Sequence, residues 1–191
     1  LADANEELRR GQYFFRDIIK DGIVLYELEG TKPFVTPQPL NPREALEMAQ
    51  EHYKQWFPGA ERFNEGANYF RFKGWEKEAA FLLHQTVERL YAGVLLVLTN
   101  YGPSTHNIKF LRSLAEQLDQ RLIGAWPRAS RKEKRPYEIL TEAYVKARYS
   151  KHFKISEEDL NWLGERTKIL QELVETICNE RIDQLKADLL E

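Results

Sequence analysis

Hydrophobic positions follow a helical period over almost the whole chain from Asn41 onward. Asn41-Pro42-Arg43-Glu44 predicts a helix start, because Asn is a good N-cap, Pro suits the first helical position and Glu suits the first turn. The clearest apolar stripe comes after Trp75, at steps of three and four: Ala79, Leu82, Leu83, Val87, Leu90, Val94, Leu95 and Leu98. This spacing predicts a long helix with one buried face.

Turn and capping signals divide the rest of this region into further helices. Pro58-Gly59 predicts an interruption of the first helix, and Asn100 to Pro103 ends the second. Ser104 or Thr105 is the expected cap of a third helix that includes Leu122. Trp126 to Pro136 reads as a basic loop before a fourth helix, and Ser156 opens a fifth that runs to about Arg181. Short connections favour antiparallel neighbours, so we expect an all-α, antiparallel up-and-down bundle of about five helices.

The first 40 residues have a different pattern. Leu1 to Gly11 predicts a short polar helix, Ile23 to Tyr26 has strand composition, and Glu29 to Pro39 reads as a linker with three prolines. A single strand cannot form a sheet, so its partners are expected outside this chain. We therefore expect a short α/β remnant of another domain at 1–40 and a helical bundle at 41–191. The start at Leu1 rather than Met fits a piece of a longer protein.

Composition narrows the class of protein. The 191 residues are 42% hydrophobic and 30% charged, which excludes a disordered chain, and a net charge of −2 excludes a globally basic nucleic-acid binder. Cys178 is the only cysteine, so we expect no intramolecular disulfide and a reducing, cytoplasmic location. The uncharged apolar run from Leu90 to Thr99 is shorter than a membrane span, and no membrane partner is expected. No Cys/His cluster has zinc spacing, so no metal site is expected.

Positive charge is concentrated late in the chain. Residues 128–154 carry nine Lys and Arg against three Glu, a local charge of +6. Tyr137, Tyr144 and Tyr149 add stacking surfaces, so this region favours an anionic partner such as a nucleotide or RNA. The alternative is a solvated charged face.

Three small groups of polar residues are candidates for chemistry. His84, Glu88 and Tyr91 share one helix face and could contact a ligand, or could form a satisfied pair at an interface. Thr105-His106 at a helix start could hold a phosphate, or could serve only as a cap. Arg148 and His152 could cleave RNA as phosphate stabiliser and acid–base group, or could only complement a helix C-terminus.

Three stretches resemble the HEPN family of helical domains. Phe81 to Ala92 resembles its signature helix, Ser104-Thr105-His106-Asn107-Ile108 resembles the "Thr-His-x-Ile/Leu" start of its next helix, and Tyr144 to Tyr149 resembles its "Tyr-x-x-Ala-Arg-Tyr" stretch. The resemblance covers residues 41 to 182. Residues 13 to 26 resemble the tail of the minimal nucleotidyltransferase domain that often precedes HEPN in one polypeptide.

The resemblance implies a homodimer with a nucleotide or RNA site in the cleft between protomers. Arg148 and His152 match the catalytic "Arg-x(4–6)-His" motif of HEPN ribonucleases by position, although three residues separate them here. The expected nucleotide- and phosphate-binding residues are Lys146, Arg148, Lys151, Tyr144, His84 and Glu88.

This resemblance leaves three functions open. The first is a nucleotide- or RNA-binding module of a nucleotidyltransferase–HEPN fusion. The second is a metal-independent, toxin-like ribonuclease of a toxin–antitoxin pair. The third is a structural dimerisation module for an upstream nucleotidyltransferase. We expect no cofactor in this chain, and a magnesium ion only with the missing nucleotidyltransferase domain.

Overall fold

The computed structural model describes residues 2–9, 15, 18, 19, 22–26, 30, 34, 35 and 40–190. Within them the secondary structure is helical, with no strand, which confirms the all-α prediction. The elements are α1 (Ala2–Arg9), α3 (Pro42–Phe72), α4 (Glu76–Thr99), α5 (Ile108–Leu118), the 3₁₀ helix η1 (Gln120–Ala125), α6 (Arg131–Tyr149) and α7 (Glu157–Ala187).

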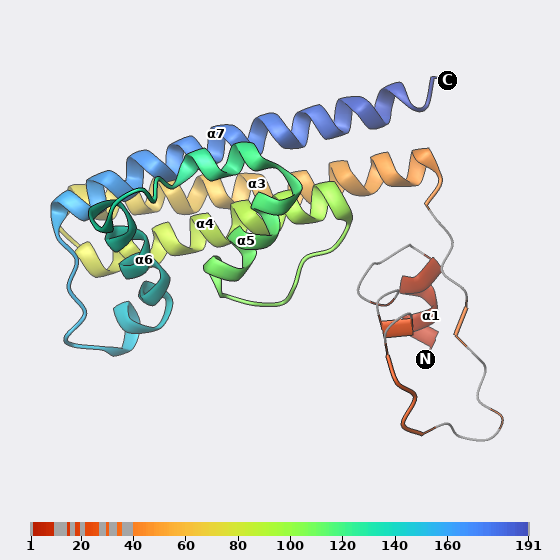
Figure 1. Ribbon diagram of the computed structural model, residues 1–191, viewed down its shortest axis with the longest axis horizontal. Helices are drawn as coiled ribbons and strands as arrows, with labels where there is room; N and C mark the ends of the chain where they lie inside the picture. The colour runs from red at the N-terminus through yellow and green to blue at the C-terminus, as the bar shows by residue number, and fades with distance from the viewer. Residues whose placement is uncertain are drawn as a thin grey trace.

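The helix α4 is the centre of the bundle, and α3, α5, α6 and α7 all pack against it. Its apolar stripe is buried as the periodicity predicted, with Leu83, Val87 and Val94 fully inaccessible to solvent. In Figure 1, α3 runs antiparallel to α4, while α7 lies alongside them and runs in the same direction as α4. The chain reverses between α4 and α7 through α5, η1 and α6, and α6 crosses the long helices steeply in this view.

The predicted interruption at Pro58-Gly59 is wrong, because α3 is continuous from Pro42 to Phe72. Pro58 has no N–H to donate within the helix, but residues on both sides of it, including Phe57 and Ala67, are buried against the bundle. Gly59 leaves room for the side chain of Arg89 from α4, because a Cβ there would lie 2.8 Å from Nη1 of Arg89. Tertiary packing therefore outweighs the local break signal.

The capping signals were read correctly at the starts of α3 and α7 and at the end of α4, where Asn100 is the C-cap, but not at the starts of α5 and α6. Asn41 and Glu44 form a capping box, and Ser156 caps α7, which continues past the predicted end to Ala187. The cap of α5 is Asn107, whose side chain accepts from the N–H groups of Lys109 and Phe110, rather than Ser104 or Thr105.

The predicted basic loop is also shorter than expected. Ser130 and Glu133 form a capping box, so α6 begins at Arg131 and Pro136 lies inside it. Leu122, assigned to the third helix from sequence, belongs to η1.

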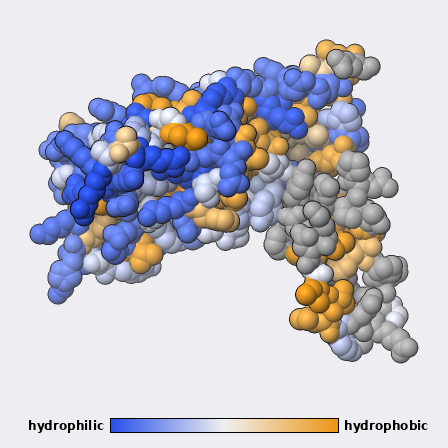
Figure 2. All heavy atoms as spheres, in the orientation of Figure 1, coloured by the Kyte–Doolittle hydropathy of each residue, from blue (hydrophilic) through white to orange (hydrophobic). Residues whose placement is uncertain are grey.

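The predicted strand Ile23 to Tyr26 is wrong. These residues have no regular secondary structure, and their side chains are 75–94% exposed. Figure 2 shows hydrophobic atoms at the lower end of the N-terminal part, below the largely hydrophilic face of the bundle. Tyr13, Phe14, Asp21 and most of the predicted linker lie outside the described residues.

In the described part of the chain, α4 is the one helix long and apolar enough to cross a membrane. Of its most apolar window, 61% is buried inside the bundle, as in the core helix of many globular proteins. This is weak evidence for a membrane span.

Candidate functional site

The ring of Tyr144 on α6 is the centre of a group of polar and aromatic side chains on the surface of α4. His106 stacks on this ring, with centroids 4.2 Å apart and planes at 18°. The guanidinium carbon of Arg148 lies 4.3 Å from the same centroid, and the His84 ring lies 5.4 Å away. Together with Phe81 and Glu88, these residues form what we call the Tyr144 cluster.

Helical periodicity explains how the sequence builds the cluster. Phe81, His84 and Glu88 are spaced by three and four residues, so they share one face of α4. Tyr144 and Arg148 are one turn apart on α6, which packs across that face. His106 immediately precedes Asn107, the cap of α5, so the start of this helix fixes the histidine above α4.

Glu88 holds His106 in place. Nδ1 of His106 lies 3.0 Å from both carboxylate oxygens of Glu88, whose side chain is only 13% exposed. Gln85 donates a further hydrogen bond to Glu88, at 3.3 Å. The His106 side chain itself is 57% exposed. A carboxylate on Nδ1 favours a proton there and leaves Nε2 free to accept one.

His84 is fully buried beneath the cluster. Burial, together with the nearby His106 and Arg148, lowers its pKa to about 4, so the imidazole is neutral at pH 7. Its Nδ1 is 3.7 Å from Glu88 and 3.4 Å from the amide nitrogen of Gln85. No hydrogen bond of ordinary geometry reaches its Nε2. The backbone of His106 lies near the ring and raises the pKa of His84 slightly, against the larger effect of burial. A buried polar atom without a partner of good geometry is costly, which makes His84 a sensitive position of the core.

Arg148 is exposed and has no carboxylate partner within the described residues. Its Nε donates to the Tyr144 carbonyl at 2.7 Å, and its guanidinium lies over the rings of Phe81 and Tyr149, at 5.1 and 5.0 Å. Aromatic rings therefore position the charge while the Nη groups stay available. This arrangement suits a planar guanidinium that binds phosphate.

Five residues named from sequence fall into two groups. His84, Glu88, Tyr144 and Arg148 come together in the Tyr144 cluster, as described above. His152 lies beyond the end of α6 in an exposed turn, and no hydrogen bond, ion pair or ring contact joins its side chain to Arg148 in the described structure.

The two predicted lysines lie outside the cluster. Lys146 is exposed and pairs with Glu142 one turn earlier, at 2.8 Å. Lys151 is exposed beside His152, and its carbonyl and that of Ser150 accept from Nζ of Lys77 at the start of α4, at 3.5 and 3.2 Å. Tyr91 does not join His84 and Glu88 either, because its hydroxyl accepts from Nε1 of Trp126 in the core at 2.9 Å.

Much of the positive charge in 128–154 is compensated within the chain. Arg135 pairs with the buried Asp159 at 3.0 Å, and Lys146 pairs with Glu142 at 2.8 Å. These carboxylates offset part of the positive charge, so a sum of Lys and Arg along the sequence overstates the positive field of this face.

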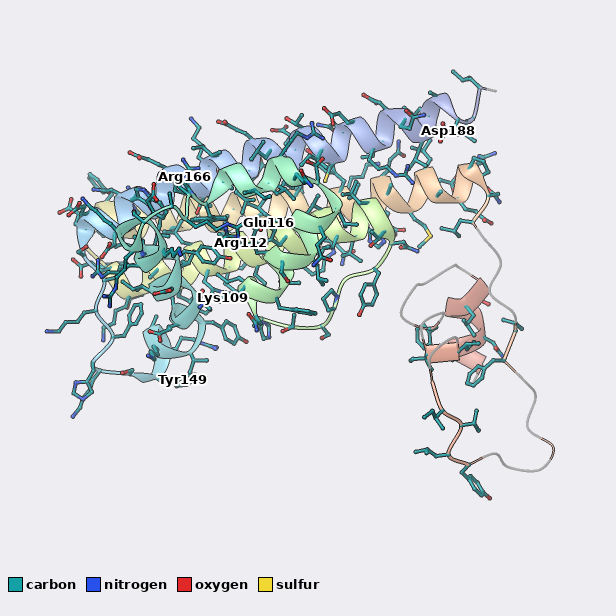
Figure 3. All side chains as sticks on the ribbon, viewed as in Figure 1. Lys109, Arg112, Glu116, Tyr149, Arg166 and Asp188 are labelled. Carbon is teal, nitrogen blue, oxygen red and sulfur yellow. The ribbon has the colours of Figure 1, made fainter. Side chains whose placement is uncertain are left out.

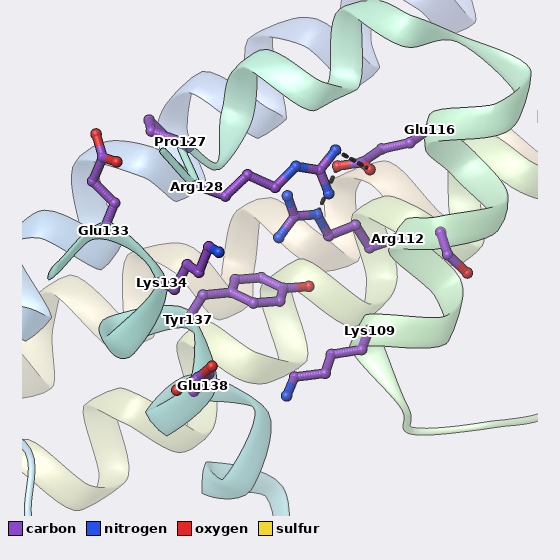
Figure 4. A pocket seen from close by; sticks show the side chains of 10 residues that line it. Lys109, Arg112, Glu116, Pro127, Arg128, Glu133, Lys134, Tyr137 and Glu138 are labelled. Carbon is purple, nitrogen blue, oxygen red and sulfur yellow. Dashed lines mark hydrogen bonds and ion pairs between the residues drawn. The ribbon is translucent and has the colours of Figure 1, made fainter. Parts of the chain in front are cut away.

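A cavity of about 250 Å³ between α5 and α6 was missed from sequence. Arg112, Glu116 and Lys109 line it from α5, and Tyr137 lines it from α6 (Figures 3 and 4). Its parts are up to 29 residues apart in sequence, so no local motif marks it. Across the described residues, including this cavity, no three His, Cys, Asp or Glu side chains are grouped so that they could hold a metal ion.

Comparison with protein-family models decides the family. The HEPN domain model matches residues 53–177, which is more than half of the chain and includes the whole Tyr144 cluster. The chain belongs to the HEPN family. No curated protein matches it. Membership of the HEPN family supports a nucleotide- or RNA-related function in general, and the matched segment lies outside the predicted nucleotidyltransferase tail at 1–40.

Proposed function

We propose that this HEPN domain binds single-stranded RNA or a nucleotide at the Tyr144 cluster. The observation that carries the proposal is the contact of two different groups, the His106 imidazole and the Arg148 guanidinium, with one tyrosine ring. A stacking surface beside an uncompensated guanidinium is the combination that proteins use for unpaired nucleotides.

Each member of the cluster has a distinct role in this proposal. Arg148 donates charge-assisted hydrogen bonds to a phosphate. A base extends the stack on the exposed side of His106, whose orientation depends on Glu88. His84 is fully buried beneath the ring of Tyr144 and supports the floor of the site. Lys151 and His152, both exposed beyond α6, add positive charge or donors along the phosphate backbone.

A titration with a fluorescently labelled single-stranded RNA tests the proposal. We expect saturable binding that weakens as salt rises, because phosphate contacts release counterions. Affinity should fall in the Arg148→Gln variant. Absence of saturable binding by the folded protein at low salt would overturn the proposal and favour a structural dimerisation module.

A metal-independent ribonuclease is the second candidate, favoured by the His106–Glu88 contact at 3.0 Å. In this reaction the 2′-hydroxyl oxygen attacks the adjacent phosphorus while its proton passes to an imidazole. The bond from phosphorus to the 5′-oxygen breaks, and that oxygen takes a proton from water. The products are a 2′,3′-cyclic phosphate and a 5′-hydroxyl, and Arg148 stabilises the negative charge that develops on the non-bridging phosphate oxygens.

The position of His106 gives the ribonuclease candidate a test between two histidines. Cleavage that survives His152→Ala and is lost in His106→Ala assigns the base to His106, whereas the reverse result assigns it to His152. Equal cleavage by both variants and the wild type would point to a contaminating nuclease and remove this candidate.

The finer predictions from the resemblance also stay proposals. They are a fusion to a nucleotidyltransferase through residues 1–40, a toxin–antitoxin role, and a homodimer. The exposed Val145 and Tyr149, one turn apart on α6 beside Arg148, support a protein contact on this face. Sedimentation analysis of the wild type and Val145→Lys would test the dimer, which the added charge should weaken.

A further inference from the structure

The cavity between α5 and α6 is separate from the Tyr144 cluster and has no role in the function proposed above. Three segments line it: α5, the residues that precede α6, and the first turns of α6 (Figure 4). The apolar part of the lining comes from Tyr137 and Pro127. A site with an apolar wall and a few convergent charges is typical of small-ligand binding.

Two guanidinium groups share one carboxylate in this cavity. Glu116 accepts from Nε of Arg112 at 2.6 Å and from Nη2 of Arg128 at 3.0 Å. Arg112 and Glu116 are each 11% exposed, so water screens their charges only partly. One carboxylate neutralises one arginine, which leaves a unit of positive charge at the wall of the cavity.

The Arg112 side chain is held rigidly and still has free donors. Its Nη2 donates to the Trp126 carbonyl at 3.3 Å, and its guanidinium lies over the Tyr137 ring at 4.8 Å. The guanidinium also has a side-chain hydrogen-bond interaction with Tyr137, and its outer end points into the cavity toward Lys134 in Figure 4. These donors are preorganised for an anion.

Some of the other charged side chains that line the cavity have partners within the protein, and others have none. Lys109 and Lys134 are exposed and form no ion pair within the described residues. The Glu133 carboxylate accepts from the N–H and hydroxyl of Ser130, at 2.8 and 3.1 Å, and is used as a helix cap. Glu138 is the one remaining acid of the lining, and the local balance stays positive.

We propose that this cavity binds a phosphate group together with the sugar that carries it. Arg112, Arg128 and Lys134 contact the phosphate, and Tyr137 and Pro127 cover the sugar. The volume of about 250 Å³ is below the range of about 300 to 1,000 Å³ for whole drug-sized ligands, so a base extends outside. The phosphate belongs either to a free nucleotide or to an RNA strand.

The distance between the cavity and the Tyr144 cluster distinguishes a free nucleotide from an RNA strand. Tyr137 and Tyr144 are seven residues apart on α6, a rise of about 10 Å. An RNA strand spans both sites, whereas inorganic phosphate or a mononucleotide occupies one. The cavity proposal does not depend on RNA binding at the Tyr144 cluster.

Phosphate titrations of the full chain, followed by amide NMR and calorimetry, test the site. The probes are inorganic phosphate, adenosine monophosphate and a six-nucleotide single-stranded RNA. We expect shifts of the Lys109 and Ser113 amides with all three, and an Arg128→Gln variant that binds phosphate about tenfold more weakly. In Arg128→Gln, Glu116 stays paired with Arg112. The control is Arg131→Gln, which removes the same charge from an exposed residue outside the cavity, and its phosphate affinity should stay within about twofold of wild type.

The outcomes distinguish this site from the Tyr144 cluster. Phosphate binding that Arg128→Gln leaves unchanged and Arg148→Gln removes would overturn the cavity proposal and support the cluster. Loss in Arg128→Gln with no effect of Arg148→Gln on any probe supports the cavity and contradicts the cluster. If Arg128→Gln fails to fold, Lys134→Glu at the exposed rim replaces it, with the same expected loss. If Arg131→Gln loses as much phosphate affinity as Arg128→Gln, the loss reflects the net charge of the protein rather than the cavity, and the cavity proposal is overturned.

Discussion

The imidazole of His106 lies parallel to the phenol ring of Tyr144, with centroids 4.2 Å apart, although the two residues are 38 positions apart and on different segments. This stack joins the start of α5 to the last turns of α6 above the middle of α4. A histidine at a helix start and a tyrosine in a basic stretch, which the sequence presents as separate features, therefore form one continuous surface.

Replacing Tyr144 by Leu should weaken RNA binding about tenfold, because the stack on which a base rests loses its inner ring. Tyr144→Phe should stay within about twofold of wild type, since the phenol hydroxyl makes no hydrogen bond in the described structure. Fluorescence anisotropy with single-stranded RNA measures both. Tyr69→Leu, a half-exposed tyrosine at the end of α3, is the control. Equal affinities for Tyr144→Leu and wild type would show that the ring supports the fold only.

Arg148→Gln should reduce RNA affinity about tenfold and lower the slope of binding against salt by about one phosphate contact. The melting temperature should change little, because Arg148 is exposed and forms no ion pair within the described chain. Lys146→Gln removes the same charge two residues away, where Glu142 already compensates it at 2.8 Å, and should have a smaller effect. A lower melting temperature with unchanged affinity would make Arg148 a structural residue.

The sequence was sufficient for the bundle because the dominant signals are local. The stripe of α4 and the Asn41 and Ser156 caps each lie within a few residues, and each predicted its element correctly. The same local rules were wrong at Pro58, where packing against α4 outweighs the lost hydrogen bond. They also missed the capping box of Ser130 and Glu133, hidden by the surrounding basic residues and Pro136.

The candidate site could be predicted in its parts but not in its arrangement. His84, Glu88, Tyr144 and Arg148 were named from spacing, composition and family resemblance, yet the contact of Glu88 with His106 depends on how α5 begins above α4. The cavity could not be predicted from the sequence. Its central ion pairs, from Arg112 and Arg128 to Glu116, form only when the residues before α6 pack against α5.

Cys178 on α7 should resist alkylation in the folded protein. Its side chain is 1% exposed, and burial raises the pKa of the thiol to about 12, so almost no thiolate exists at pH 8. Iodoacetamide followed by mass spectrometry should find the native protein unmodified and the urea-unfolded protein with one added group. Rapid modification of the native protein would contradict the packing of α7 against α4.

The buried His84 should make the bundle less stable in mildly acidic solution. Its pKa is about 4 in the folded protein and about 6.5 in an unfolded chain, so between these values the unfolded state binds the extra proton. The free energy of unfolding therefore falls as pH drops from 6.5 toward 4, by up to about 3 kcal/mol in total. Above pH 6.5 both states are neutral at this site, and its contribution is constant.

Urea unfolding at pH 7 and pH 5 measures this effect in the wild type and in His84→Gln. The variant loses packing at both pH values, so the informative quantity is the difference between them, which should shrink relative to wild type. His152→Gln, which removes an exposed histidine outside the core, should retain the wild-type difference. If His84→Gln also retains it, the imidazole is accessible to protons in the folded state and is not the neutral, buried group at the base of the Tyr144 cluster.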